Sequence, residues 1–367
     1  MSEPRIRPWL LKLSYPIGGL ILLATLASHF SRYFHPDQFG ILPFFGIVFP
    51  VLVILALIIL VYWIISKSKF SILGILTLLI VWTSLSRTFQ INIKGEKSEN
   101  SISVMSYNVR LFDYYNWSRV GQTRDWIYEF LKAQEPDILC IQEFYHDNTG
   151  YFPTLDTLSE LNKIKHMHLE NYFSISDERQ WGMATLTKYP IVGKGRINFK
   201  GTYGNLGIYT DVIINQDTTR IYNLHLQSVR FGHDDYKLME DILEKSELED
   251  LKKSRMLLER MHDAWVKRAE QSELMAEHIS LSPYPVIMCT DLNDGPISFA
   301  YETVSKGLKN SFVESGTGIG NTYAGMVPFL RIDNIFYSDE YTATNHTVHH
   351  HDLSDHYAIS AMLTKAD

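Results

Sequence analysis

The sequence predicts an α/β domain with mixed sheets, preceded by a segment of three transmembrane helices. Three observations support this prediction. Apolar stretches without charged residues fill most of residues 1–87, strand-like alternation begins at residue 101, and a long helical pattern covers residues 236–280. Beyond residue 101, strands and helices both alternate and cluster along the chain, as they do in domains with mixed sheets.

Three apolar stretches, at residues 13–31, 41–66 and 70–86, predict the three transmembrane helices within residues 1–87. The first two contain no Lys, Arg, Asp or Glu. A helix needs about 20 residues to cross the hydrocarbon core, with about 17 as the lower limit. A buried helical hairpin of a soluble protein is the alternative. Residues 13–86 are therefore expected to contact a lipid bilayer.

The placement of basic residues predicts the orientation in the membrane. Arg5, Arg7 and Lys12 precede the first stretch, and Lys67 and Lys69 lie between the second and the third. The positive-inside rule places both groups in the cytoplasm. Three crossings then make the protein multi-pass and leave the rest of the chain extracytoplasmic. If the first stretch were a cleaved signal sequence, the other two would still export the large domain after them.

A polar linker is predicted at residues 88–100, before a large domain at residues 101–367. Nine of the 34 Lys and Arg residues and three of the 41 Asp and Glu residues lie at or before Ser98, which leaves 25 basic and 38 acidic residues beyond it. This acidic balance argues against a broad, sequence-independent grip on nucleic acid. It leaves room for a bound cation that supplies positive charge locally.

The large domain begins with a strand at "SISVMSYNV" and a helix at "TRDWIYEFLKAQ". In that helix Trp126, Ile127, Phe130 and Leu131 share one face. "PDILCIQE" is a short apolar strand, "GMATLTKYPIVGKGRINF" predicts two strands joined by a Tyr-Pro turn, and "GIYTDVIINQDTTRIYNLHLQ" predicts a hairpin.

A long charged helical region is expected at residues 236–280, where apolar residues recur at helical spacing from Leu238 to Ile279. "PVIMCTDLN", "RIDNIFY" and "YAISAML" are further strands. Cys140 and Cys289 lie in apolar runs, which favours two buried thiols over a disulfide.

Polar side chains recur at the ends of these strands or just beyond them. Any one of them alone is more often a turn former or a cap. Together they indicate one cleft that receives polar groups from several strands. The residues are Asn108, Gln142, Glu143, His225, Gln227, Asp291, Asn293, Asp333, Asp355 and His356.

The runs that carry these residues resemble the motifs of the endonuclease/exonuclease/phosphatase family, the deoxyribonuclease-I-like superfamily. They are "SYNVR", "IQEF", "NLHLQS", "TDLND", "RIDNIF" and "SDH", and they occur in the family's order across residues 101–363. The resemblance implies a four-layer α/β/β/α sandwich of two mixed sheets flanked by helices. It also implies metal-dependent hydrolysis of a phosphoester.

The resemblance implies a metal site as well. Glu143 is the first-choice ligand, Asn108 helps to hold the metal and a phosphate oxygen, and Asp355 is a possible additional ligand. Mg²⁺ is the expected cofactor, with Mn²⁺ possible, because a hard cation prefers carboxylate oxygen and borrows a substrate phosphate as a ligand.

The catalytic roles that the resemblance implies leave two candidates for the general base. His356, oriented by Asp333, is one of them, because a carboxylate on one imidazole nitrogen raises the basicity of the other. Asp291, oriented beside Asn293, is the other. His225 is placed to protonate the leaving oxygen. Arg230, Arg331 and Lys188 are candidates to contact the substrate phosphate, but for each of them the role of an ordinary surface cation is at least as plausible.

The expected substrate is a phosphodiester, either nucleic acid or a phospholipid headgroup. Abasic-site endonucleases generally carry Tyr where this chain has His225, and "LRIDNIF" lacks the Cys-Asp-Arg motif of inositol-polyphosphate 5-phosphatases. "NLHLQS" is most similar to the sphingomyelinase and secreted-nuclease branches. Membrane spans and an acidic domain favour a phospholipid headgroup. A catalytically inactive, membrane-anchored binding module is the alternative from another class.

Overall fold

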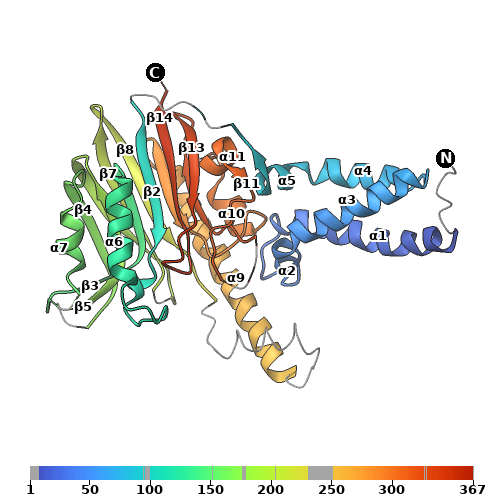
Figure 1. Cartoon of the computed structure of the whole chain (residues 1–367), viewed down its shortest axis with the longest axis horizontal. Coiled ribbons are helices and arrows are strands. Elements are labelled where there is room, and N and C mark those ends of the chain that lie inside the picture. Colours follow the sequence, from blue (N-terminus) through green and yellow to red (C-terminus); the bar gives the residue numbers. More distant parts are fainter. Residues whose placement is uncertain are drawn as a thin grey trace.

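The computed structural model of the chain describes residues 8–93, 95, 100–150, 152–175, 179–202, 204–229, 251–325, 327 and 329–366. Its N-terminal helices project from one side of a body built of two β-sheets (Figure 1). These helices are α1 (Pro8–Ser31), α2 (Leu42–Ile47), α3 (Phe49–Ile65), α4 (Ser71–Ile80) and α5 (Trp82–Thr88).

The prediction of three transmembrane helices is wrong. Among the described residues, one helix is long and apolar enough to cross a membrane, Trp9–Ser31 within α1. The second apolar stretch divides at Val48 into α2 and the 17-residue α3, because Pro50 fits only the first turn of a helix. The third bends by 62° between α4 and α5, so it could count as a second span only if the bent pair is taken as one.

One six-stranded sheet is mixed. Strands β2 and β3 are parallel, and the other neighbours are antiparallel. In spatial order its strands are β13 (Tyr341–His349), β14 (Ala358–Lys365), β2 (Ile102–Asn108), β3 (Ile138–Asp147), β5 (Arg179–Thr187) and β4 (His166–Ile175).

The other six-stranded sheet is also mixed, with β8 and β9 as its parallel pair. In spatial order its strands are β10 (Lys309–Asn310), β12 (Asp333–Tyr337), β9 (Val286–Asp291), β8 (Asp217–His225), β7 (Leu206–Ile214) and β6 (Ile191–Asn198).

The two sheets pack face to face around a shared apolar core. Fully buried residues from both meet there, among them Val104 and Cys140 of one sheet and Ile221 and Cys289 of the other. Both cysteines are free and buried, as the sequence predicted.

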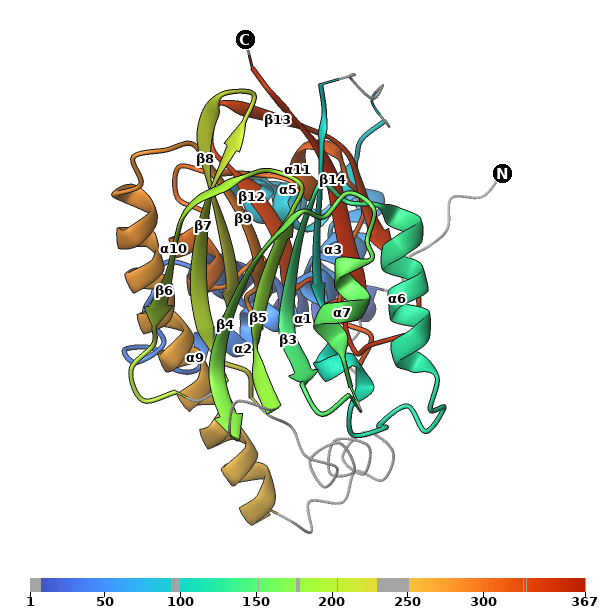
Figure 2. The same ribbon diagram turned by 90° about the vertical axis from the view of Figure 1, so that its left-hand side faces the viewer.

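Helices cover the outer faces of both sheets. Figure 2 shows α9 along one side and α6 and α7 along the opposite side, which gives the expected four layers. The remaining helices and short elements are η1 (Arg110–Asp113), α6 (Thr123–Gln134), α7 (Thr154–Ser159), α9 (Leu251–Ser280), α10 (Phe299–Val304) and α11 (Ser311–Ser315), with β1 (Gln90–Ile91) paired to β11 (Thr317–Gly318).

Most of the predicted elements are present at the predicted places. The hairpin is β7–β8, turned at Asn215 and Gln216, both of which have positive φ. In α6, Ile127 and Leu131 are fully buried, but Trp126 is 45% exposed, so the apolar face is narrower than predicted. The helix predicted over residues 236–280 is observed from Leu251 onwards; its earlier part, with Leu238, lies outside the described residues.

Candidate active site

Strand ends from both sheets bring the candidate polar residues together. Asn108, His225 and Asp291 are the last residues of β2, β8 and β9. Asp333 is the first residue of β12 and pairs with Asp291 across the antiparallel ladder. His356 lies just before β14, which is antiparallel to β2. Opposite chain directions therefore place the start of β12 and β14 beside the ends of their neighbours.

Asp291 lies at the centre of this group and has no exposed surface. One of its carboxylate oxygens, Oδ2, accepts a hydrogen bond from Asn108 Nδ2 at 2.9 Å. The other, Oδ1, accepts from the backbone N–H of Asn293 at 2.9 Å. The Nε2 atoms of His225 and His356 lie 3.6 and 3.7 Å from Oδ2. The carboxylate is thus held by two donors and faces two imidazoles.

Asp333 and His356 form a buried carboxylate–imidazole pair. His356 Nδ1 lies 3.0 Å from Asp333 Oδ2, while Asp333 Oδ1 has no hydrogen-bond partner among the described residues. Burial lowers the pKa of His356, but Asp333 and then Asp291 outweigh it, so this pKa lies well above its ordinary value. Burial raises the pKa of Asp333, although His356 opposes the shift. The imidazole is therefore the basic member of the pair, with Nε2 directed toward Asp291.

Glu143 points into the site because β3 is irregular there. The register of β3 against β5 shifts between Ile141 and Phe144, and Glu143 has φ +51°. A bulge of this kind redirects a side chain. Glu143 Oε1 lies 3.3 Å from Asn108 Nδ2 and 3.7 Å from His225 Nε2, and its side chain is 29% exposed. Burial raises the pKa of Glu143, and His225 opposes that rise.

His225 is buried, yet neither ring nitrogen has a hydrogen-bond partner among the described residues. A buried polar atom without a partner costs stability unless something outside the protein satisfies it. Its Nε2 faces both Glu143 and Asp291, so a ligand between these groups would be within reach of the imidazole.

The rim of the site contains Asp355, whose side chain is 31% exposed. Its Oδ2 lies 3.5 Å from Arg110 Nε, and Ser354 beside it donates to the backbone oxygen of Asn108 at 2.9 Å. An open cavity of about 390 Å³ adjoins this rim and is lined by Arg110, Asp355, Tyr323 and neighbouring polar residues. The acidic site is thus accessible from solvent on this side.

The residues present fit a divalent cation. Asp291, Asp333 and His356 are all buried, and one potential ligand atom from each lies within 4.8 Å of the others. Glu143 adds a fourth ionisable group beside Asn108. Crowded carboxylates repel one another, and hard cations prefer carboxylate and amide oxygen. Asp333 Oδ1, which has no hydrogen-bond partner among the described residues, is a further potential ligand atom.

The eight residues with an expected metal or catalytic role all lie in or beside this site, but two of them do not face its centre. The side-chain amide of Asn293 donates to the backbone oxygen of Leu226 at 3.0 Å, so Asn293 supports Asp291 through its backbone. Asp355 lies at the rim and is paired with Arg110.

Two of the three proposed phosphate contacts are engaged by other protein groups. Lys188 pairs with Asp137 at 2.8 Å, and Arg331 is 1% exposed with its Nη2 donating to the backbone oxygen of Arg87. Neither cation is free for substrate. Arg230 lies outside the described residues.

The sequence did not reveal a buried ion pair that supports the site from behind. Arg268 of α9 is 2% exposed, and its Nε lies 3.1 Å from Asp294 Oδ2. Its Nη1 also donates to the backbone oxygen of Gln227 at 2.8 Å. Arg268 therefore links the segments just beyond His225 and Asp291. In the sequence it stands among many charged helical residues, so no local signal distinguished it.

Gln142, predicted from the sequence to be one of the polar residues of the cleft, instead belongs to a network that joins the two sheets beneath the site. Gln142 is fully buried, and its Nε2 donates to Ser106 Oγ at 3.0 Å and to Asn223 Oδ1 at 2.8 Å. Asn223 in turn donates to the backbone oxygen of Ala184 at 2.9 Å. These amides fix β8 against the sheet that contains Glu143.

Two family models match the chain. One, described as the endonuclease/exonuclease/phosphatase family, matches residues 105–356, and one for a domain of unknown function matches residues 11–88. No curated protein matches the chain.

Several solved structures share the fold. An endonuclease/exonuclease/phosphatase family protein from Bacteroides thetaiotaomicron is 16% identical, with a TM-score of 0.53 over 74% of this chain and 100% of that one. A mannosyl-6-phosphatase from the same species is 17% identical, with a TM-score of 0.51 over 72% and 100%. D. rerio TDP2 in complex with single-stranded DNA product is 16% identical, with a TM-score of 0.51 over 73% and 100%.

Proposed function

Because the chain belongs to the endonuclease/exonuclease/phosphatase family, we propose that it is a phosphodiester hydrolase that requires a divalent cation. One observation carries the proposal: the buried carboxylate of Asp291 lies within 3.7 Å of Asn108, His225 and His356. These groups come from or adjoin the ends of separate strands in two sheets. Their convergence on one buried carboxylate is best explained by a common ligand.

Glu143 and Asn108, with Asp355 at the rim, are the residues that would hold the cation, and Mg²⁺ is the proposed ion, with Mn²⁺ as an alternative. When bound, such a cation would neutralise phosphate charge and help to activate a water. Glu143 and Asp355 offer the carboxylate oxygens that such a cation prefers. Asn108 directs its amide nitrogen at Glu143 and Asp291, and its Oδ1 accepts from the Arg110 N–H, so its amide would have to turn over to offer its oxygen.

The two histidines are placed for proton transfer. His356, held at Nδ1 by Asp333, presents Nε2 as an acceptor for a proton from water. His225 would donate a proton to the leaving oxygen: its ring nitrogens have no hydrogen-bond partner in the part of the chain that the structure describes, and its Nε2 faces Glu143 and Asp291. Asp291 is the competing base, but both of its carboxylate oxygens are already engaged: Oδ2 accepts from Asn108 Nδ2 and Oδ1 accepts from the backbone N–H of Asn293. We therefore favour His356.

Hydrolysis of bis-p-nitrophenyl phosphate by the purified full-length chain tests the proposal. We expect turnover with Mg²⁺ or Mn²⁺ and none after chelation, restored by adding the metal back. p-Nitrophenyl phosphate in parallel separates diester from monoester hydrolysis, since one structural neighbour is a mannosyl-6-phosphatase. A chain that hydrolyses neither substrate with any metal would instead favour an inactive binding module.

The charges that line the rim cavity bear on the physiological substrate. Three acidic side chains, Asp113, Asp352 and Asp355, line the rim cavity with Arg110, so a leaving group with few negative charges fits it better than a nucleic-acid chain does. We therefore favour a phospholipid headgroup, as in sphingomyelinases, over DNA. Comparing single-stranded DNA with sphingomyelin vesicles distinguishes the two, and faster cleavage of DNA contradicts this preference.

We further propose that the chain is tethered to a membrane through α1. This helix exposes large apolar side chains such as Leu20 and Leu23 along much of its length. Its flanking basic residues place the N-terminus in the cytoplasm, and one crossing by α1 leaves the catalytic domain extracytoplasmic. An alkaline phosphatase fused at the C-terminus is expected to be active, and an inactive fusion contradicts this orientation.

A further inference from the structure

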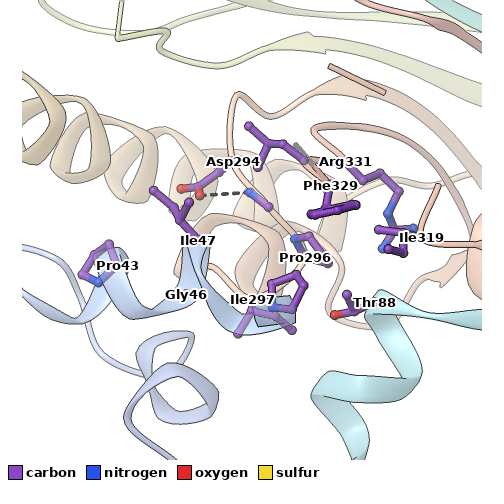
Figure 3. Close-up of a pocket in the computed structure, with 13 residues that line it drawn as sticks. Pro43, Gly46, Ile47, Thr88, Asp294, Pro296, Ile297, Ile319, Phe329 and Arg331 are labelled. Atoms are coloured by element: carbon purple, nitrogen blue, oxygen red, sulfur yellow. Dashed lines mark hydrogen bonds between the residues drawn. The ribbon is translucent and has the colours of Figure 1, made fainter. Parts of the chain in front are cut away.

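The N-terminal helices (Pro8–Thr88) dock onto the loop that leaves the active site after Asp291. Figure 3 shows Gly46 and Ile47 of α2 beside Pro296 and Ile297 of that loop. Ile297 is only 3% exposed and packs with Phe49 and Val53 of α3. A short stretch of backbone thus connects the catalytic carboxylate to a side chain buried among the N-terminal helices.

The contact is close enough to fix the loop backbone. Ser31 Oγ of α1 lies 3.1 Å from the backbone oxygen of Ile297. A Cβ atom added at Gly46 would lie 2.6 Å from the same oxygen, so only glycine fits there. The cavity that remains between the parts is about 20 Å³, which has room for about one water molecule. This junction is therefore packed rather than open to a ligand.

A second contact ties the neighbouring strand to the same helices. Arg331, close before Asp333, is almost fully buried, and its Nη2 donates to the backbone oxygen of Arg87 at 2.7 Å. The guanidinium of Arg87 pairs with Glu302 of α10. Because Asp333 and Asp291 are opposite each other in the β12–β9 ladder, both carboxylates are attached to segments that the N-terminal helices hold.

The loop is also fixed on its other side. Asp294, between Asp291 and Ile297, is paired with the buried Arg268 of α9 at 3.1 Å. Because the loop is held at Asp294, a displacement of Ile297 should either move the backbone at Asp291 or break the buried Arg268–Asp294 ion pair.

We propose that the N-terminal helices are a positioning element of the active site, acting through Ile297 and Arg331 on Asp291 and Asp333. This inference rests on the proposed function of that site. Ile297 and Arg331 are positioning residues, since neither is among the groups that surround Asp291. A misplacement of about 1 Å from a distant change can reduce the rate of a reaction by about 10²-fold.

Two matched glycine substitutions test the proposal in the full-length chain. Gly46→Ala adds a methyl group against the Ile297 carbonyl, whereas a Cβ added at Gly19 of α1 meets nothing within 4 Å. Alanine is a better helix former than glycine, so helix propensity alone should stabilise both variants. We expect Gly46→Ala to lower kcat by about 10-fold with KM within about twofold, and Gly19→Ala to match the wild type. The one hydroxyl proton of Ser31 is shared between the backbone oxygens of Ser28 at 2.7 Å and Ile297 at 3.1 Å, so Ser31→Ala, which adds no bulk, should lower kcat by about 2- to 3-fold at most.

Hydrogen exchange of the segment 292–299 gives a readout that does not depend on activity. Amides there should exchange faster in Gly46→Ala than in the wild type, and at an unchanged rate in Gly19→Ala. The proposal is overturned if Gly46→Ala keeps the wild-type kcat, if the loss is carried by KM, or if Gly19→Ala loses as much. If the wild type hydrolyses no phosphoester, the proposed function is wrong. The positioning role is then tested by hydrogen exchange alone, and an unchanged exchange rate of segment 292–299 in Gly46→Ala overturns it.

Discussion

The inner part of the candidate site and its rim are built differently. Asp291, Asp333, His225 and His356 are each at most 5% exposed, whereas the side chains of Glu143 and Asp355 are 29% and 31% exposed. Within the inner group, Asp291 accepts hydrogen bonds from Asn108 at a strand end and from Asn293 in a loop, and Asp333 pairs with His356. Of the two more exposed carboxylates, Glu143 lies beside Asn108 and His225, and Asp355 pairs with Arg110 and lines the open cavity.

This difference in exposure suits the two sets of groups to two tasks, proton transfer and the exchange of cation and substrate. Buried groups in fixed contact are suited to orient a proton acceptor, because they need no reorganisation during the reaction. Partly exposed carboxylates are suited to exchange a hydrated cation and substrate with solvent. If Glu143 and Asp355 hold the cation, losses caused by substitution of Asp333 or His356 should resist added metal, whereas losses at Glu143 and Asp355 should respond to it.

The largest effect is expected from His356→Ala. It removes the proposed base and leaves Asp333 and Asp291 facing each other without the imidazole between them, so kcat should fall by about 10³- to 10⁴-fold. The rate of bis-p-nitrophenyl phosphate hydrolysis at saturating Mg²⁺ measures it. His350→Ala, at an exposed histidine nearby, is the matched control and should retain wild-type activity. Activity above a tenth of the wild type in His356→Ala would exclude His356 as the base.

Asp333→Asn should lower kcat by about 10²- to 10³-fold, because an amide at this position no longer supports an imidazolium at His356. The pH dependence of kcat distinguishes the two candidate bases. If His356 is the base, the limb of the profile that reports its deprotonation moves to lower pH, since the carboxylate that raised its pKa is gone. An unmoved limb would favour Asp291.

Glu143→Ala should lower activity at low Mg²⁺ by about 10²-fold, with part of the loss recovered at high Mg²⁺, because a metal ligand is missing while the inner groups remain. Activity measured across a Mg²⁺ titration gives the apparent affinity for the metal. Glu160→Ala, at an exposed glutamate, is the control. A loss that no metal concentration reduces would place Glu143 with the inner groups.

The smallest effect is expected from Asp355→Asn. Its side chain contacts Arg110 at the rim and is not within the group around Asp291, so kcat should fall by about 10-fold or less, with a weaker apparent affinity for Mg²⁺. A loss as large as that of His356→Ala would show that Asp355 is an essential ligand, and the separation of rim from inner site would be wrong.

Much of the site could be predicted because its residues occur in short runs that resemble family motifs. Asn108, His225 and Asp291 each end an apolar strand, and strand ends are visible in sequence as a change from apolar to polar residues. Arg268 and Asp294 gave no such signal. Each is an ordinary charged residue locally, and only the distance of 3.1 Å between them, across a long separation in the chain, makes them a buried pair.

The N-terminal segment shows the limit of composition as a guide. Its apolar stretches were correctly predicted to be helical, but their lengths were not, because Pro50 and the bend at Val81 divide two of them. Spacing alone put Trp126 on the same helical face as Ile127 and Leu131, yet Trp126 is 45% exposed while the other two are fully buried, because contacts with the rest of the fold decide how much of an apolar face is covered.

The sequence by itself determined the order of strands and helices, the class of fold and the identity of the polar residues at the strand ends, because periodicity and local chemistry are properties of neighbouring residues. Only the tertiary structure decided which of these residues are buried, that Glu143 turns inward at a bulge, and that Ile297 and Arg331 attach the site to the N-terminal helices. Those features depend on contacts between segments far apart in the chain, which no local pattern specifies.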